Sequence, residues 1–275
     1  MNDNQLQTLI IGGTGKTGRR VAQRLERRGV PAAIASRSGT PAFNWNEPAS
    51  WAPLLSGARA VYLAYHPDVA APGAAERLGA LSRMAVHSGV QRIVLLSGRG
   101  EPASLPSERA VSECGAAFTI LRCAFFCQNF SEGALLEPVL SGEVAFPAGE
   151  VAEPFIDAED IADVAVEALT RAEHAGKIDD LTGPRLLTFA EAAQCIASAT
   201  SKSVRYVPVT PEAYRAALAE HVARDEADFW SELFRKLLDG HNAQVSAGVE
   251  QVLGRKPRDF AAYVRDAAAA GAWNR

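Results

Sequence analysis

Short apolar segments alternate with amphipathic segments through the first two-thirds of the chain. The apolar segments predict buried strands over residues 6–12, 31–35, 60–64, 92–97 and 117–121. Between them, apolar residues recur at helical spacing, which predicts helices over residues 17–28, 74–88 and 107–114. Buried strands that alternate with helices indicate a parallel sheet covered by helices on both faces.

Beyond about Leu135 the pattern changes to helices with little strand between them. Short extended pieces are predicted over residues 153–156 and 204–207. Helices are predicted over residues 160–171, 188–199, 211–219, 225–239 and 259–270. We therefore predict an α/β fold: a Rossmann-like, doubly wound parallel sheet with a small, mostly helical C-terminal lobe.

The first predicted strand runs directly into a glycine-rich loop. The residues of this loop are Gly12, Gly13, Thr14, Gly15, Lys16, Thr17 and Gly18. Their G-x-x-G-x-x-G spacing lets the chain turn sharply from strand into helix and brings bare backbone close to a pyrophosphate. The N-terminus of the following helix offers free N–H groups and a partial positive charge to the same anion. The loop predicts a dinucleotide site, because a strand precedes it and a helix follows it.

The end of the second predicted strand bears on which dinucleotide binds. Sites that prefer NAD usually carry Asp or Glu there, to accept hydrogen bonds from the adenosine ribose. This chain has Ser36, Arg37 and Ser38 instead, which favours the 2′-phosphate of NADP(H) and leaves NAD(H) possible. Ligands of such sheets bind beyond the carboxyl ends of the strands, so Ala64 at the end of the third strand joins the cofactor site. Lys16 does not have the spacing of a nucleotide triphosphatase loop.

Composition excludes several other classes of protein. The chain has 275 residues, 48% of them hydrophobic, and a net charge of −4, so nothing indicates a nucleic-acid surface. No segment approaches the length of a membrane span or a signal sequence, four cysteines show no paired framework, and five histidines stand singly. We expect a cytoplasmic protein without a metal site. Basic residues gather on the first helix, where Arg20, Arg24, Arg27 and Arg28 are expected to form a solvated face.

The chain resembles the NmrA-like branch of the atypical short-chain dehydrogenase/reductases, and within it the bacterial relatives of festuclavine dehydrogenase. The segments that carry the resemblance are GGTGKTGRR (12–20), FNWNEPASW (43–51), AVYLAYHP (60–67), GVQRIVLLS (89–97), FTILRCAFFCQNF (118–130), FIDAEDIADVA (155–165), LTGPRLLTFAEAA (181–193) and LGRKPRDF (253–260). The resemblance implies an NAD(P)-binding Rossmann core over residues 1–134. Residues 135–275 would complete the sheet and add a small substrate-binding lobe, interleaved with the core.

One departure from ordinary short-chain dehydrogenases concerns the chemistry. Those enzymes carry Tyr-x-x-x-Lys after the strand that ends in Ser, and the tyrosine donates the proton. Here the segment after Ser97 reads GRGEPASLPSERAVSECG, with neither Tyr nor Lys, in agreement with many members of the NmrA-like branch. Routine ketone reduction is therefore not expected, because an alkoxide formed by hydride transfer needs a proton source.

Substrates that need little help from an acid remain compatible with the sequence. An iminium ion already carries the charge that a hydride neutralises, and a quinone or extended enone becomes a delocalised oxyanion. Tyr65, His66 and Ser97 follow strand ends and are candidates for hydrogen bonds to such a substrate, or for proton transfer by the first two. For His66, which precedes Pro67, a purely local role in its loop is favoured slightly over catalysis.

The run after the last predicted strand is expected to line the substrate cleft. Phe125 and Phe126 offer flat apolar faces to an aromatic or polycyclic substrate, and Asn129 would hold a carbonyl or tie down the loop. We expect a reductase of a secondary metabolite, such as a polyketide quinone or an alkaloid-like iminium. The alternative is a redox sensor that binds NADP(H) without turnover, as some NmrA-like proteins do. Nothing in the sequence determines the oligomeric state.

Overall fold

The computed structural model describes residues 7–274 and divides them into two compact units. The sheet unit comprises residues 7–123, 158–181 and 248–255. The C-terminal unit comprises residues 124–157, 182–247 and 256–274. The chain therefore leaves the sheet unit after β5 and returns to it twice.

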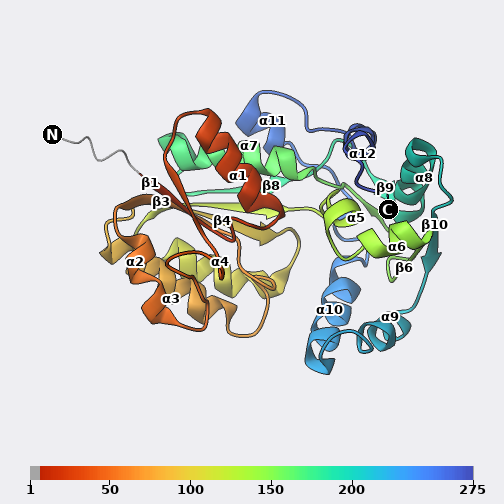
Figure 1. Ribbon diagram of the computed structural model, residues 1–275, viewed down its shortest axis with the longest axis horizontal. Coiled ribbons are helices and arrows are strands. Elements are labelled where there is room, and N and C mark those ends of the chain that lie inside the picture. The colour runs from red at the N-terminus through yellow and green to blue at the C-terminus, as the bar shows by residue number, and fades with distance from the viewer. Residues whose placement is uncertain (1–6, 275) are drawn as a thin grey trace. The chain divides into compact units, whose positions relative to one another are not determined.

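Parallel strands form the centre of the sheet unit (Figure 1). The strands are β1 (Gln7–Ile11), β2 (Ala32–Ala35), β3 (Ala58–Leu63), β4 (Arg92–Gly98), β5 (Ala117–Cys123) and β8 (Lys177–Leu181). Within residues 7–274 they form one six-stranded sheet in the order β2-β1-β3-β4-β5-β8. The order reverses between β1 and β3, which is the place where doubly wound sheets bind their ligands. The predicted Rossmann-like α/β fold is confirmed, with β8 as an edge strand that the apolar pattern did not predict.

Helices cover both faces of this sheet (Figure 1). They are α1 (Lys16–Arg27), α2 (Ala52–Leu55), α3 (Ala74–His87), α4 (Leu105–Ser112), α7 (Ala158–Thr170) and α11 (Gly248–Leu253), with 3₁₀ turns at Pro48–Ser50, Pro102–Ser104 and Ala172–His174. Leu9 and Ile11 of β1 pack into one buried cluster with Leu78 and Leu81 of α3. Their neighbour Ile10 points to the opposite face and is equally buried, as strand alternation requires. Burial on both faces explains why the strands read as continuous apolar runs.

The C-terminal unit is mostly helical. Its elements are α5 (Asn129–Glu132), α6 (Leu136–Ser141), β6 (Glu143–Phe146), β7 (Ala152–Glu153), β9 (Leu187–Thr188), α8 (Phe189–Thr200), β10 (Arg205–Pro208), α9 (Pro211–Leu218), α10 (Arg224–Leu237) and α12 (Phe260–Ala269). The strands pair as parallel β6–β10 and antiparallel β7–β9. Thr188 and Glu191 form a capping box that starts α8. The helical C-terminal region agrees with the prediction.

Aromatic side chains fill the core of the C-terminal unit. Phe189 is fully buried, and its ring centroid lies 5.1 Å from that of Phe146, 5.2 Å from that of Phe125 and 5.2 Å from that of Phe155. The contacts with Phe125 and Phe155 are edge-to-face, the arrangement that the quadrupoles of aromatic rings favour. No helix within residues 7–274 is long and apolar enough to cross a membrane.

Phe189→Ala is expected to lower the free energy of unfolding by about 3–5 kcal/mol, because it removes a buried ring from among several others and leaves a cavity. Thermal and urea unfolding measure the change. Val245→Ala in the same unit is the matched control, since Val245 is 52% exposed. Equal stability of the two variants would contradict the assignment of Phe189 to the core.

Candidate dinucleotide site

The glycine-rich loop connects β1 to α1 in the sheet unit. Gly12 has φ of +79°, a left-handed conformation that glycine adopts without strain. The N–H of Gly15 donates to the carbonyl oxygen of Gly12 at 3.0 Å and closes the turn. Gly15 is the N-cap of α1, and the first turn of this helix contains no acidic residue. The N–H groups at the start of α1 therefore meet no side-chain anion from that turn.

The helix approaches the loop so closely that Gly18 has no room for a side chain. A Cβ at Gly18 would lie 2.3 Å from the carbonyl oxygen of Gly12. The same loop presents Thr14 and Gly15 to solvent, whereas Thr17 is buried. The structure therefore exposes the part of the loop that precedes α1, and this backbone cradle fits a pyrophosphate in shape and polarity.

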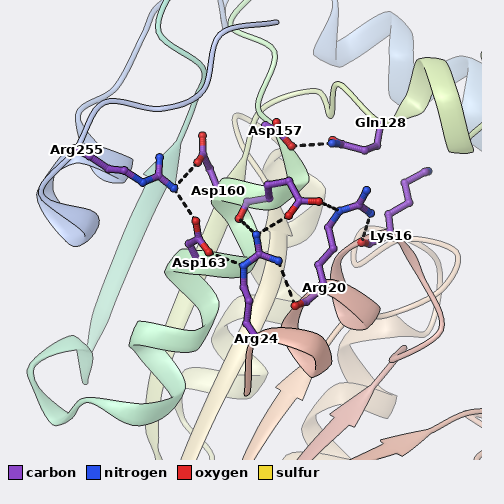
Figure 2. Close-up of polar contacts among 9 residues, drawn as sticks. Lys16, Arg20, Arg24, Gln128, Asp157, Asp160, Asp163 and Arg255 are labelled. Atoms are coloured by element: carbon purple, nitrogen blue, oxygen red, sulfur yellow. Dashed lines mark hydrogen bonds and ion pairs between the residues drawn. The ribbon is translucent and has the colours of Figure 1, made fainter. Parts of the chain in front are cut away.

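Ion pairs hold α1 against α7 behind this loop (Figure 2). Arg20 Nε and Arg24 Nη2 donate to the two carboxylate oxygens of Glu159 at 2.6 and 2.5 Å. Arg24 also pairs with Asp163. Burial would raise the pKa of the Glu159 carboxyl, but its hydrogen bonds with the two arginines lower that pKa overall. Arg20 Nη1 donates in addition to the carbonyl oxygen of Lys16 at 2.7 Å, which ties the network to the first turn of the helix.

The network extends to the segment just after α11 and corrects one expectation from the sequence. Arg255 Nη2 lies 2.7 Å from Asp160 Oδ1 and 2.6 Å from Asp163 Oδ2. The side chains of Arg20 and Arg24 are only 12% exposed, so they do not belong to a solvated face. Arg28 is half exposed and pairs with Glu167 of α7 at 2.6 Å. The arginine face of α1 is thus largely a helix–helix interface.

The end of β2 carries the residues predicted to select the cofactor. The carbonyl oxygen of Ser36 accepts hydrogen bonds from the N–H groups of Gly39 and Phe43 at 3.2 and 2.9 Å, which folds the following segment back on the strand. The hydroxyl oxygens of Ser36 and Ser38 lie 3.5 Å apart. Arg37 is exposed, and it has no ion pair or hydrogen bond with any residue from 7 to 274. Its guanidinium is available to an anion.

The loop after β3 contains three of the predicted residues. Ala64 lies directly against the glycine loop, where its N–H donates to the carbonyl oxygen of Ile11 at 3.1 Å. Tyr65 is half buried, with its ring centroid 4.6 Å from that of Trp45 and its hydroxyl accepting from Arg77 Nη1 at 3.4 Å. His66 is exposed.

A buried polar cluster joins the ends of β4 and β5 to α4. Ser97 Oγ donates to Glu108 Oε1 at 2.7 Å. Arg122 forms a bidentate pair with the same carboxylate, with Nε 2.9 Å from Oε1 and Nη2 2.6 Å from Oε2. Hydrogen bonding to Glu108 raises the pKa of Arg122. Sequence reasoning identified Ser97 but missed Glu108 and Arg122, although a Glu on the apolar side of a short helix is a usable signal.

The segment after Ser97, which contains neither Tyr nor Lys, contributes Glu108 to this cluster. The proton of the Ser97 hydroxyl is occupied by Glu108, so Ser97 can offer a substrate only the lone pairs of its oxygen in this arrangement. The catalytic role of Ser97 stays a prediction.

The residues predicted to contact substrate lie in the C-terminal unit. The Phe125 ring packs against the aromatic core, with centroids 5.9 Å from Phe146 and 5.2 Å from Phe189. Phe126 is half buried and forms a parallel β-bridge with Ile156. Asn129 is half buried and begins α5. Sequence reasoning did not anticipate that Phe125 would be part of a packed cluster.

A buried amide–carboxylate pair lies beside these residues in the same unit. Gln128 Nε2 donates to Asp157 Oδ1 at 2.7 Å, and both side chains are almost completely buried (Figure 2). The pair connects the segment after β5 with the residue before α7, so it fixes the backbone around Phe126 and Asn129.

Comparison with known proteins places the chain among reductases along nearly its whole length. It is 32% identical to the NAD(P)H azoreductase of Xenophilus azovorans, with 95% of this chain and 98% of that protein aligned. It is 30% identical to agroclavine dehydrogenase of Claviceps fusiformis, with 94% and 96% aligned. A scan against protein-family models found no match.

Solved structures share the fold at lower identity. The NADPH-dependent quinone oxidoreductase of Escherichia coli, crystallised with NADPH, superposes with a TM-score of 0.78 at 19% identity over 94% of this chain and 99% of that one. The triphenylmethane reductase of Citrobacter sp. superposes with a TM-score of 0.78 at 20% identity over 96% and 100%. The chain has the glycine loop, lacks the Tyr and Lys, and is 30% or more identical to these relatives. It therefore belongs to the NmrA-like branch of the atypical short-chain dehydrogenase/reductases, a family of NAD(P)H-dependent oxidoreductases.

Proposed function

We propose that this protein is an NADPH-dependent reductase of conjugated acceptors, such as quinones, extended enones or iminium ions with an aromatic or polycyclic framework. The observation that carries the proposal is the buried cluster at the ends of β4 and β5. In this cluster the Ser97 hydroxyl and Arg122 both bind Glu108, and the segment after Ser97 offers no tyrosine–lysine pair to donate a proton to a ketone. The reductase therefore favours acceptors whose reduced form needs only weak acid assistance.

The sheet unit offers a suitable binding site for the cofactor. The exposed backbone of the glycine loop and the N-terminus of α1 would hold the pyrophosphate, with Gly12, Gly13, Thr14, Gly15, Lys16, Thr17 and Gly18 in contact with it or shaping its cradle. Ser36 and the free guanidinium of Arg37 would bind the 2′-phosphate, and Ala64 would lie beside the dinucleotide between them. Reduced nicotinamide supplies the hydride when it is bound.

Conjugation in the substrate replaces part of the missing acid catalysis. When a quinone or an enone accepts a hydride, the electron pair spreads over an extended π-system, so a few hydrogen bonds stabilise the product. We assign those bonds to Tyr65 and His66, on the loop after β3, and to the oxygen of Ser97. Phe126 and Asn129 are proposed substrate contacts, and Phe125 supports them through the aromatic core.

The names of similar proteins support the same class of substrate. An azoreductase, a quinone oxidoreductase and a triphenylmethane reductase all act on extended conjugated systems, and agroclavine dehydrogenase adds an alkaloid to the set. We extend this common feature to the present chain, without a preference for any one of these compounds, and with secondary metabolism as the proposed setting.

A turnover screen tests the proposal. Purified protein with NADPH is expected to reduce menadione or a cyclic iminium salt at least about tenfold faster than a simple ketone such as cyclohexanone, a difference of about 1.4 kcal/mol in barrier height. NADPH oxidation at 340 nm measures each rate. Tight NADPH binding without turnover on either conjugated class would overturn the proposal and favour the redox-sensor alternative.

Gly15→Val is expected to weaken NADPH binding by at least about tenfold, or 1.4 kcal/mol, because a branched side chain would cover the exposed N–H groups at the start of α1. Gly15 has φ of −77°, which valine can adopt, and a Cβ there would lie 3.2 Å from the carbonyl oxygen of Gly12, so the variant should fold with a small shift of the loop. Calorimetric titration measures affinity and circular dichroism checks the fold. Ala32→Val, an exposed position on β2, is the control; equal affinity of both variants would place the pyrophosphate elsewhere.

Arg37→Asp is expected to weaken NADPH binding by roughly 10- to 100-fold, since a charge-assisted hydrogen bond contributes about 1.5–3 kcal/mol. NADH affinity should change little, because NADH has no 2′-phosphate. Arg27→Asp makes the same change of charge at an exposed position on α1 and controls for long-range electrostatics. An equal loss for both nucleotides would remove Arg37 from the phosphate site.

A further inference from the structure

Two further carboxyl groups lie at the carboxyl edge of the sheet, on the loops where the nicotinamide half of a dinucleotide is expected. Asp68 follows β3 and Glu101 follows β4, and these two strands are neighbours in the sheet. Glu101 comes four residues after Ser97 and Asp68 three residues after Tyr65. The proposed function uses neither carboxyl group.

Glu101 is buried without a hydrogen-bond partner for one of its carboxyl oxygens. The residue is 6% exposed, and its Oε1 has no partner among the residues that the structure describes. Its Oε2 lies over the end of β4, only 2.3 Å from the position that a Cβ on Gly98 would occupy. Its carbonyl oxygen accepts from Ser104 N–H at 3.0 Å, which holds the backbone of this turn in place. Gly98 thus leaves the space that the carboxyl group fills.

The environment of Glu101 favours a neutral acid. Burial is the main cause, and the nearby carboxylates of Asp68 and Glu108 add to it, so the pKa of Glu101 rises to about 8. Burial also raises the pKa of Asp68, against the opposing effect of the hydrogen bond from Ala70 N–H. An unpaired buried carboxylate is costly, and protonation removes that cost.

Glu108, seven residues along the same segment, has the opposite environment. Its carboxylate accepts three hydrogen bonds from Arg122 and one from Ser97, so it has a cationic partner. Two carboxyl groups on one loop and helix therefore differ in their surroundings: Glu108 is paired with Arg122, whereas Glu101 Oε1 has no partner among the described residues.

We propose that Glu101 is the proton donor of this reductase and takes the place of the missing tyrosine. The assignment rests on the proposed function. Bound reduced nicotinamide would supply a hydride to the electrophilic atom of the substrate, and the electron pair of the broken π-bond would move to the conjugated heteroatom. That heteroatom forms a bond to the proton as the O–H bond of Glu101 breaks. Glu101 is left as a carboxylate and regains a proton from water, so each turnover consumes one hydride and one proton.

This role distinguishes two kinds of acceptor. Reduction of an azo bond or a neutral imine places electron density on nitrogen, which needs a proton. Reduction of a triarylmethyl cation forms a neutral hydrocarbon centre and needs only the hydride. A donor at Glu101 should therefore accelerate the first reaction far more than the second.

Glu101→Gln tests the assignment, because it keeps the shape of the side chain and removes the acid. Rates with 4-(dimethylamino)azobenzene and with malachite green, a triarylmethyl cation, are measured at saturating NADPH. The azo-to-cation rate ratio is expected to fall by about 10²-fold or more, the usual contribution of a general acid. Glu113→Gln, at an exposed position just after α4, should leave the ratio unchanged. An unchanged ratio in Glu101→Gln would overturn the assignment.

A second measurement does not depend on turnover or on a folded variant. Infrared spectroscopy of the protein without nucleotide should show a carboxyl group that ionises near pH 8. No carboxyl titrating between about pH 6 and pH 9 would overturn the proposal whatever the kinetics show. If wild-type protein shows this titration but reduces neither dye, the proposed reductase function fails for these substrates while the neutral state of Glu101 holds.

Asp68→Asn tests whether Glu101 acts as an acid, because the expected change in the pH dependence of azo reduction would not occur if Glu101 had only a structural role. The amide keeps an oxygen for Ala70 N–H but removes a negative charge that disfavours ionisation of Glu101. The pKa of Glu101 should fall, and the alkaline loss of azo reduction should move to lower pH. A shift in the opposite direction, or none, would contradict a donor coupled to Asp68.

The same group makes stability depend on pH in a defined direction. The pKa of Glu101 is raised in the folded state from 4.5 to about 8, so the folded protein binds this proton more tightly than the unfolded chain does. The stabilisation is complete below about pH 4.5 and is lost as the pH rises to about 8. Asp68, whose pKa is also raised by burial, contributes in the same direction. Glu101→Gln should therefore flatten the fall of Tm between pH 5 and pH 9.

Discussion

The close approach of α1 to the glycine loop is the constraint on which the dinucleotide site depends. Gly18 lies so near the carbonyl oxygen of Gly12 that any side chain would separate the helix from the strand. The helix N-terminus reaches the carboxyl edge of the sheet only because this contact is made through bare backbone. Ion pairs from Arg20 and Arg24 to α7 then fix the helix from its other side, so the anion site is held between two independent contacts.

The charged groups at the strand ends differ in whether the protein itself provides them with a partner. Arg122 neutralises Glu108, and together with Ser97 it forms a closed hydrogen-bonded unit that links two strands to α4. Arg37, by contrast, has no partner among the described residues, and Glu101 has an unsatisfied oxygen. Groups that are unsatisfied within the protein itself are the ones expected to meet a ligand or a proton. Arg37 is the candidate for the first and Glu101 for the second.

The sequence predicted the sheet and the glycine loop well, since both depend on local patterns. Strand β8 was missed because its residues, KIDDL, are mostly polar and belong to an edge strand. Periodicity placed Arg20 and Arg24 away from the apolar stripe of α1, but it could not distinguish solvent from a partner helix about 140 residues later. Phe125 shows a similar limit of sequence-based prediction, because the sequence pattern around an apolar residue is the same whether the residue lines a pocket or packs in a core. Glu101 was passed over because burial in a loop leaves no periodic signal.

The acidity of the proton donor connects the missing tyrosine with the proposed class of substrate. A phenol has an ordinary pKa near 10 and needs a neighbouring lysine to donate readily at neutral pH. A buried carboxyl group with a pKa of about 8 is protonated for the most part at neutral pH and can supply a final proton to a delocalised anion. Such a donor suits a heteroatom in a conjugated system, where the negative charge that develops is shared and only a final proton is needed. The fold of the family is thus kept, and the proposed role of Glu101 is to supply, through its burial, the acid that the acceptor requires.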